Sequence, residues 1–465
     1  MKKTFLRSAA IAVAVTGASA AHAVHVNPDG LGQVLLYPYY TVQNNFVTAI
    51  HVVNTTDQVK AVKVRFLEGK NSQEVLDFNL YLSPFDVWTG TVVPDAAAGA
   101  KITSTDTSCI APRQLAAGGE AFRNTQYATE DSPVDLNRRR EGYIELIEMG
   151  VLTDPAQITA VTHVAGTPPG CATIASADFA GSIMVSAPTG GLFGSGHLVS
   201  VDGGVRASYD PTALDGFTDG PLWSKSGSLL PSLEQAIPFA DIIDGNNVIG
   251  FAAATGIDAV SAVLTQDVIA NEYTIDAGRL SQTDWIVTFP TKRFYVNTPI
   301  PTPFQNVWDP ELKQSCHDVG FEYFDREEAG ITPGTGDFSP APLIPGFALC
   351  NEVNTLTLYR AGTVDDDGRL FGAVSTAASL AINDFDAGWM SITFGVDPAP
   401  AVGTPYGQLV DSNGASVTGL PVIGFSASRN VNTVDVQIDG LNVYSAVMGE
   451  NAHKGSKDIG VPTAQ

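Results

Sequence analysis

The sequence predicts a mainly β protein with one or two antiparallel, immunoglobulin-like sandwich domains, long loops and few short helices. Three observations predict this class. Short runs alternate apolar and polar residues, turn residues separate these runs about every ten residues, and glycine and proline supply 45 and 28 of the 465 residues. No fixed-period repeat is visible, which argues against a solenoid or a propeller.

Five strands are expected near the start of the chain, at Gln33–Val42, Phe46–Asn54, Val62–Leu67, Val75–Leu82 and Phe85–Val93. The third run alternates valine and phenylalanine with lysine and arginine, which is the period of a half-buried strand. Turns rich in asparagine and glycine separate the runs. This regular spacing is the main support for an antiparallel sandwich.

A longer strand is predicted at Gly142–Val151, where apolar residues surround Glu145 and Glu148. Because these glutamates are three residues apart, a strand would point them to opposite sides. By themselves they do not form the carboxylate pair of a glycosidase. The best helix is predicted at Ile257–Tyr273, where apolar residues recur every three or four positions. Later strands are expected at Trp285–Val296, Thr355–Tyr359, Gly388–Gly395, Pro421–Ala427 and Val434–Met448.

The expected domain organisation follows composition. We predict a signal peptide at 1–23, a β-sandwich domain with inserted loops and one helix at 24–296, a proline-rich connection or insertion at 297–345, a second β-rich region at 346–450 and a polar tail at 451–465. The second region would either form its own unit or complete the first sandwich.

The start of the chain predicts export. Lys2, Lys3 and Arg7 precede the apolar run Ala9–Val15, and Ala21–Ala23 is a small-x-small cleavage site. That run is shorter than the roughly 20 residues of a membrane span, and no later segment is apolar enough, so no integral membrane segment is expected. The predicted location is the periplasm or the extracellular cell surface. A net charge of −24 argues against a nucleic-acid partner.

Cys109, Cys171, Cys316 and Cys350 are the only cysteines. An even number of cysteines in an exported chain predicts two disulfides, for which three connectivities exist. We favour Cys109–Cys171 and Cys316–Cys350, which are sequential and lie in separate loop-rich regions. A metal site is the alternative, although the chain has no CxxC pair.

Two segments are candidate binding sites. One is the acidic turn Asp365, Asp366 and Asp367, which precedes Gly368. Carboxylates at a glycine turn suit Ca²⁺, which is the one cofactor considered. Because the spacing is not that of an EF-hand, a solvated turn is the alternative. Tyr37, Tyr39 and Tyr40 are candidate glycan contacts, and ordinary sheet packing is their alternative role.

No motif predicts a catalytic residue. The chain lacks GxSxG, GxGxxG, Walker and HExxH patterns. His51 is expected inside a strand and His197 in a turn. The basic run 136–141, which includes Arg138, is interpreted as a solvated turn or a protected strand edge, with an anion site as the alternative.

Several stretches carry a resemblance. Residues 27–40, 62–87, 141–150, 190–193 and 283–296, among them NPDGLGQVLLYPYY and TDWIVTFPTKRFYV, resemble a family of exported, β-rich proteobacterial proteins without a known activity. The resemblance implies an exported β-rich protein and transfers no functional residue.

These observations favour an exported, non-enzymatic structural or cell-surface protein, such as a component of a surface layer, matrix or filament. Self-assembly or a cell-surface partner is expected, with Ca²⁺ bridging carboxylates between subunits. The alternative is an exported carbohydrate-active hydrolase or a glycan-binding protein. A periplasmic ligand-binding module ranks last, because only one convincing helix is predicted.

Overall fold

The computed structural model describes residues 23–130, 135–327, 329–331, 347–360, 369–382, 385–394, 407–431, 436–438, 441–443 and 446–460. These residues form a mainly β fold in which the strands pair antiparallel, apart from one parallel pair described below. Residues 1–22 of the predicted signal peptide, the aspartate turn 365–367 and the last five residues lie outside the described residues.

The first sheet has the strand order β1-β14-β2-β10-β4-β5-β8, and β11 pairs with β10. Its strands are β1 (His25–Val26), β2 (Val34–Thr41), β4 (Lys60–Glu68), β5 (Glu74–Leu82), β8 (Cys109–Ala111), β10 (Glu141–Leu152), β11 (Val185–Ser186) and β14 (Thr212–Asp215). The long strand predicted at 142–151 is therefore confirmed as the central strand β10.

The second sheet packs face to face on the first. Its order is β13-β12-β3-β6-β7-β9, formed by β3 (Phe46–Asn54), β6 (Val87–Asp95), β7 (Gly99–Thr103), β9 (Glu120–Ala121), β12 (Leu192–Ser200) and β13 (Val205–Tyr209). Leu35 and Phe66 of the first sheet share a buried core with Trp88 and Leu198 of the second. The five expected early strands are β2 to β6, so the alternation of apolar and polar residues predicted them correctly.

Two further sheets form the C-terminal half. The third has the order β22-β21-β26-β18-β34, and the fourth has the order β25-β24-β19-β30-β33, in which β24 and β25 are parallel. The strands are β18 (Val268–Thr274), β19 (Gln282–Thr288), β21 (Gly320–Asp325), β22 (Gly330–Ile331), β24 (Val353–Arg360), β25 (Ala377–Ile382), β26 (Ala387–Thr393), β30 (Ile423–Val431), β33 (Ala446–Ala452) and β34 (Lys454–Ser456).

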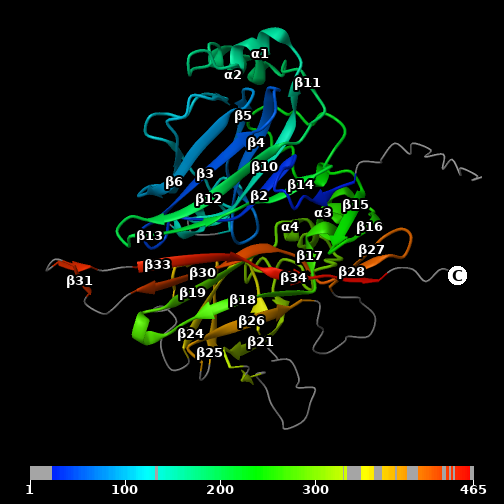
Figure 1. The fold of residues 1–465 in the computed structure, drawn as a ribbon. Helices are drawn as coiled ribbons and strands as arrows, with labels where there is room; N and C mark the ends of the chain where they lie inside the picture. Colours follow the sequence, from blue (N-terminus) through cyan, green and yellow to red (C-terminus); the bar gives the residue numbers. More distant parts are fainter. Residues whose placement is uncertain are drawn as a thin grey trace, which may run out of the picture.

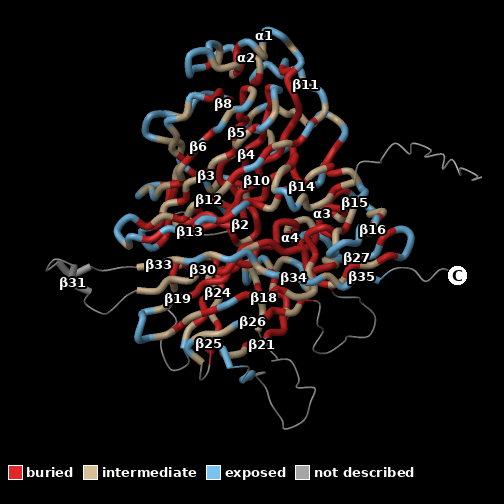
Figure 2. The backbone as a smooth tube through the Cα atoms, viewed as in Figure 1, coloured by how far each residue is buried: buried red, intermediate tan, exposed pale blue. Residues whose placement is uncertain are grey.

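The fourth sheet joins the two halves (Figure 1). Its central strand β19 alternates sides, as a strand must. Ile286 enters the core of the first two sheets, whereas Trp285 and Val287 enter a second core shared with the third sheet. Figure 2 shows the resulting buried region running through the junction of the halves. The fold is therefore continuous across the junction.

This topology differs from the predicted domain boundary at 297–345. Strands β18 and β19 precede residue 297 but belong to the third and fourth sheets. The chain thus enters the C-terminal half between β14 and β18. The predicted polar tail also contributes strands, because β34 pairs with β18 and β35 (Asp458–Gly460) pairs with β28 (Ser416–Thr418).

Short elements complete the fold. The α-helices are α1 (Pro155–Val161), α2 (Cys171–Ala180), α3 (Gly256–Leu264) and α4 (Lys292–Val296), and the 3-10 helices are η1 (Asn137–Arg139), η2 (Leu233–Gln235) and η3 (Ala277–Arg279). The remaining strands are β15 (Phe239–Asp244), β16 (Asn247–Ala252), β17 (Thr265–Gln266), β20 (His317–Asp318), β23 (Ala348–Leu349), β27 (Gln408–Val410), β29 (Leu420–Pro421), β31 (Val436–Ile438) and β32 (Leu441–Val443).

The helix predicted at 257–273 is only half correct. Helix α3 ends at Leu264, and Val268–Thr274 forms strand β18. In β18 the residues alternate between more and less buried positions, which is the period of a strand. Thr265, at the helix C-cap, already has an extended backbone. The spacing of valine and isoleucine fitted both periods, and tertiary pairing with β26 decided the second half.

Both predicted disulfides are present. Cys109 bonds Cys171, and Cys316 bonds Cys350. The first ties helix α2 to strand β8, so it holds the helices α1 and α2 over one end of the first sheet (Figure 1). Two structural disulfides indicate a protein of an oxidising compartment.

Candidate functional site

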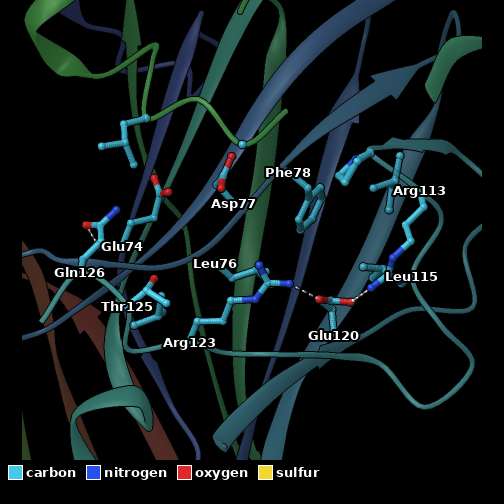
Figure 3. A pocket seen from close by; sticks show the side chains of 15 residues that line it. Glu74, Leu76, Asp77, Phe78, Arg113, Leu115, Glu120, Arg123, Thr125 and Gln126 are labelled. Carbon is cyan, nitrogen blue, oxygen red and sulfur yellow. Dashed lines mark hydrogen bonds and ion pairs between the residues drawn. The ribbon is translucent and has the colours of Figure 1, made fainter. Parts of the chain in front are cut away.

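A cavity of about 310 Å³ opens beside strand β5 (Figure 3), and we call it the β5 cavity. It forms because β8 pairs with β5 only from Asn79 to Tyr81. Pro112 then follows β8, and proline has no N–H with which to continue the ladder. The chain returns at Arg123, whose backbone N–H donates to the carbonyl of Val75 over 2.8 Å. The cavity lies between these two points.

Three segments line the β5 cavity, namely β5 itself, residues 110–126 and residues 227–229. Residues 110–126 contribute apolar contacts through Leu115 and a charged group at the rim. There Arg113 and Arg123 both donate to Glu120, over 2.6 and 2.8 Å (Figure 3). The two arginine side chains are 58% and 63% exposed, so solvent screens these ion pairs and they add little stability.

Two carboxylates face the cavity because of a β-bulge. Leu67 pairs with Glu74 and Phe66 pairs with Leu76, which leaves Val75 as an extra residue on β5. Glu74 and Asp77 are three residues apart, yet the bulge places them on one side of the strand. The sequence alone did not reveal this pair, because alternation without a bulge puts them on opposite sides.

Each of these carboxylates has a cation beside it. Arg65 Nε donates to Glu74 over 2.8 Å, and Lys63 forms an ion pair with Asp77. Burial raises the pKa of Glu74, Arg65 lowers it and Asp77 raises it. The pair is therefore held by two cations from the neighbouring strand. Free carboxylates for acid–base chemistry would need a different arrangement.

The ion pairs continue across the first sheet. Arg65 also donates to Glu145 of β10 over 2.6 Å, Lys60 binds Glu148 over 2.6 Å, and Arg138 binds Glu68 over 2.7 Å; all of these side chains are buried. On β4, Lys63 and Arg65 alternate with core valines and project from the other face, whereas Lys60 lies on the side of Val62 and Val64. Burying these charges is tolerable because each has a partner of opposite sign.

Arg138 corrects the interpretation of the basic run. The run was expected to form a solvated turn or a protected strand edge, but Arg138 is 1% exposed and also binds Glu130 over 2.9 Å. Its partners are carboxylates of the same chain, and the run therefore anchors β10 to the β4–β5 turn. Glu145 and Glu148, as predicted, do not pair with each other, because they bind Arg65 and Lys60.

The three tyrosines proposed to contact a glycan lie in the core. Tyr37, Tyr39 and Tyr40 are each 0% exposed. Tyr37 donates its hydroxyl to the carbonyl of His51 over 2.7 Å, and Tyr40 packs edge-on against Phe122. This burial leaves no ring face for a sugar. The packing role, which was the alternative for aromatic residues in strands, is the one that the structure gives them.

A serine and two histidines meet on the outer face of the second sheet. His51 lies in β3 as expected, whereas His197 lies in strand β12 and not in a turn. Ser195 Oγ lies 3.0 Å from His197 Nε2, and Arg206 lies 2.8 Å from His197 Nδ1. Because arginine only donates, Nδ1 accepts and the ring proton sits on Nε2. His197 therefore donates to Ser195 and cannot act as its general base in this arrangement.

No group of three or more His, Cys, Asp or Glu side chains within the described ranges could hold a metal ion. The predicted calcium ligands Asp365, Asp366 and Asp367 lie outside those ranges. Among the described helices, none has the length and apolar character needed to cross a membrane.

Comparisons with models of protein families, with curated proteins and with solved structures found no match to this chain. The resemblance to a family of exported β-rich proteins therefore stays a prediction.

Proposed function

We propose that the protein is an exported, non-enzymatic structural or cell-surface component of a surface layer, matrix or filament. The observation that carries this proposal is the use of charge in the first sheet. The buried cations Lys60, Lys63, Arg65 and Arg138 are paired with carboxylates of neighbouring strands. Charges arranged in this way specify how strands align and leave little for chemistry.

The energetic argument concerns specificity. A buried ion pair adds little net stability over an apolar pair, but removing one partner costs about 3–5 kcal/mol. Arg65 serves both Glu74 and Glu145, which binds β5, β4 and β10 into one arrangement. A scaffold of this kind suits a protein whose task is to hold a shape.

The proposal also covers the type of sandwich, the signal peptide and the location of the mature chain. Each pair of packed sheets is an immunoglobulin-like sandwich. The first 23 residues are a signal peptide, and the mature chain resides in the periplasm or on the extracellular surface. The two disulfides support an oxidising destination of this kind.

Light scattering after size-exclusion chromatography tests the assembly role. Residues 24–465 are measured with calcium and then with EDTA, and we expect a large assembly that EDTA dissociates. Replacing Asp365, Asp366 and Asp367 by asparagine should abolish it. Replacing the exposed Asp57, Asp202 and Asp219 by asparagine removes the same charge and should leave it intact. A monomer under both conditions would contradict the proposal.

The alternative is an exported carbohydrate-active hydrolase or a glycan-binding protein. One observation favours its binding form: an exposed tryptophan, Trp389, lies beside a second and more polar cavity. Glycoside hydrolysis by the purified mature chain would contradict the non-enzymatic proposal.

A further inference from the structure

The second cavity lies at the rim between the third and fourth sheets. It measures about 580 Å³ and is lined by residues of β18, β21, β26, β30 and β33, together with Arg326. We call it the Trp389 cavity. Its volume falls within the range of small-molecule sites.

Strand register places an aromatic pair at this cavity. Glu272 of β18 pairs with Trp389 of β26, and Trp389 pairs with Phe324 of β21. The three side chains therefore form one row across the sheet. Trp389 is 43% exposed, while its neighbour Met390 is 0% exposed and enters the core. The indole thus points away from the core.

Phe324 covers one face of the indole. The rings of Trp389 and Phe324 are stacked, with centroids 4.5 Å apart and an interplanar angle of 15°. Because β26 lies between β21 and β18, Phe324 covers the side toward β21. The other face is directed toward β18 and Glu272. Phe324 therefore fixes the orientation of an aromatic platform beside the cavity.

Polar side chains at this cavity have unused hydrogen-bonding groups. In the part of the chain that the structure describes, the side chains of Glu272, Arg326 and Asn451 have no hydrogen-bond or ion-pair partner. Asp325 accepts from the backbone N–H groups of Glu327 and Ala329 over 2.8 and 2.9 Å, which leaves its second oxygen available. Carboxylate, guanidinium and amide groups are thus gathered beside one indole.

This combination fits a saccharide. A sugar presents an apolar C–H face, which packs on an aromatic ring, and hydroxyls, which donate to carboxylates and accept from guanidinium and amide groups. Two carboxylates against one guanidinium disfavour an anionic ligand. We infer that the Trp389 cavity is a binding site for a neutral saccharide, with Trp389 as the platform and Glu272, Arg326 and Asn451 as hydroxyl contacts.

Sugar binding here does not depend on the proposed assembly role, because the two are measured separately. It is tested by titrating the mature chain with N-acetylchitotriose, cellotriose and maltotriose, followed by calorimetry and by saturation-transfer NMR. At least one of these trisaccharides should bind. Trp389→Ala should weaken its binding by about tenfold or more, since the stacking surface is lost.

Two variants serve as controls for this test. Phe193 is a similarly exposed aromatic residue, at 38%, on strand β12 of the second sheet, and Phe193→Ala should not change the affinity. Trp389→Phe retains a ring and should bind within about threefold of the parent, which separates stacking from any loss of folding.

Four results would overturn the inference. They are no binding of any trisaccharide, equal binding by Trp389→Ala, preference for a trimer of galacturonic acid over the neutral sugars, and hydrolysis of the bound sugar. The last two would replace a neutral-sugar binding site with an anion site or a catalytic one.

Discussion

The β5 cavity and the Trp389 cavity differ in how their charged side chains are satisfied. At the β5 cavity, Glu74 and Asp77 are paired with Arg65 and Lys63 of the same sheet. At the Trp389 cavity, Glu272 and Arg326 have no such partner in the described part of the chain. The charges at the β5 cavity hold strands together, whereas the charges at the Trp389 cavity are available to a ligand.

The aromatic residues follow the same division. Phe78 lines the β5 cavity but is 2% exposed and packs on Trp88 in the core. Trp389 packs on Phe324 and is 43% exposed. An opening in a protein surface is therefore a better candidate for binding when its polar and aromatic groups are not already used by the fold.

The largest expected effect comes from breaking the buried network at Arg65. Arg65→Met leaves Glu74 and Glu145 without this cation, and we expect the free energy of unfolding to fall by about 3–5 kcal/mol. Urea denaturation of the mature chain measures it. Arg113→Met is the matched control, since it removes an exposed arginine at the rim of the same cavity and should cost less than about 1 kcal/mol. Equal losses in the two variants would show that burial does not set the value of these pairs.

The buried carboxylate of Asp284, whose pKa is raised by burial and lowered by the charge of Arg369, sharpens the comparison through its pH dependence. Asp284 is 0% exposed, and burial raises its pKa to about 6, against hydrogen bonds from Phe371 and Thr357 that lower it. The folded state thus holds a proton that the unfolded state, with a pKa of about 4, has already lost. This contribution is present at low pH and disappears as the pH rises through 6.

Asp284→Asn removes that titration. We expect the difference in unfolding free energy, parent minus variant, to fall by about 2 kcal/mol between pH 4 and pH 7. Urea denaturation at a series of pH values measures the difference. A constant difference over this range would mean that Asp284 is ionised in the folded protein throughout.

The smallest expected effect is on stability at Trp389. Trp389→Ala removes a cross-strand contact with Phe324 and should lower the free energy of unfolding by about 1 kcal/mol or less. Thermal and urea denaturation of the variant measure it. A loss as large as that of Arg65→Met would place Trp389 among the residues that hold the fold and would remove the distinction between the two cavities.

The sequence predicted local features better than distant ones. Alternation in VKVRF predicted strand β4 and its two faces, and the even number of cysteines predicted two disulfides. The partners of Lys63 and Arg65 could not be predicted, because they depend on the order of strands in the sheet and on the bulge at Val75. The partner of Arg138 is equally distant, 70 residues away in the chain.

The candidate sites illustrate the same limit. The aromatic run at Tyr37 drew attention because three tyrosines lie close together, yet a strand in the middle of a sheet buries both of its faces here. Trp389 was not singled out, although its alternation with Met390 and Ile392 carries a signal. If those two residues face the core, the tryptophan before them faces outward.

Hydrogen exchange of the mature chain, with and without a saturating trisaccharide, tests the contrast between the two cavities most directly. We predict slower exchange in β18, β26 and the segment after β21, at the Trp389 cavity, and unchanged exchange at residues 74–78 and 110–126 of the β5 cavity. Protection at the β5 cavity alone would contradict the account, because it would place the ligand where the charges are already paired.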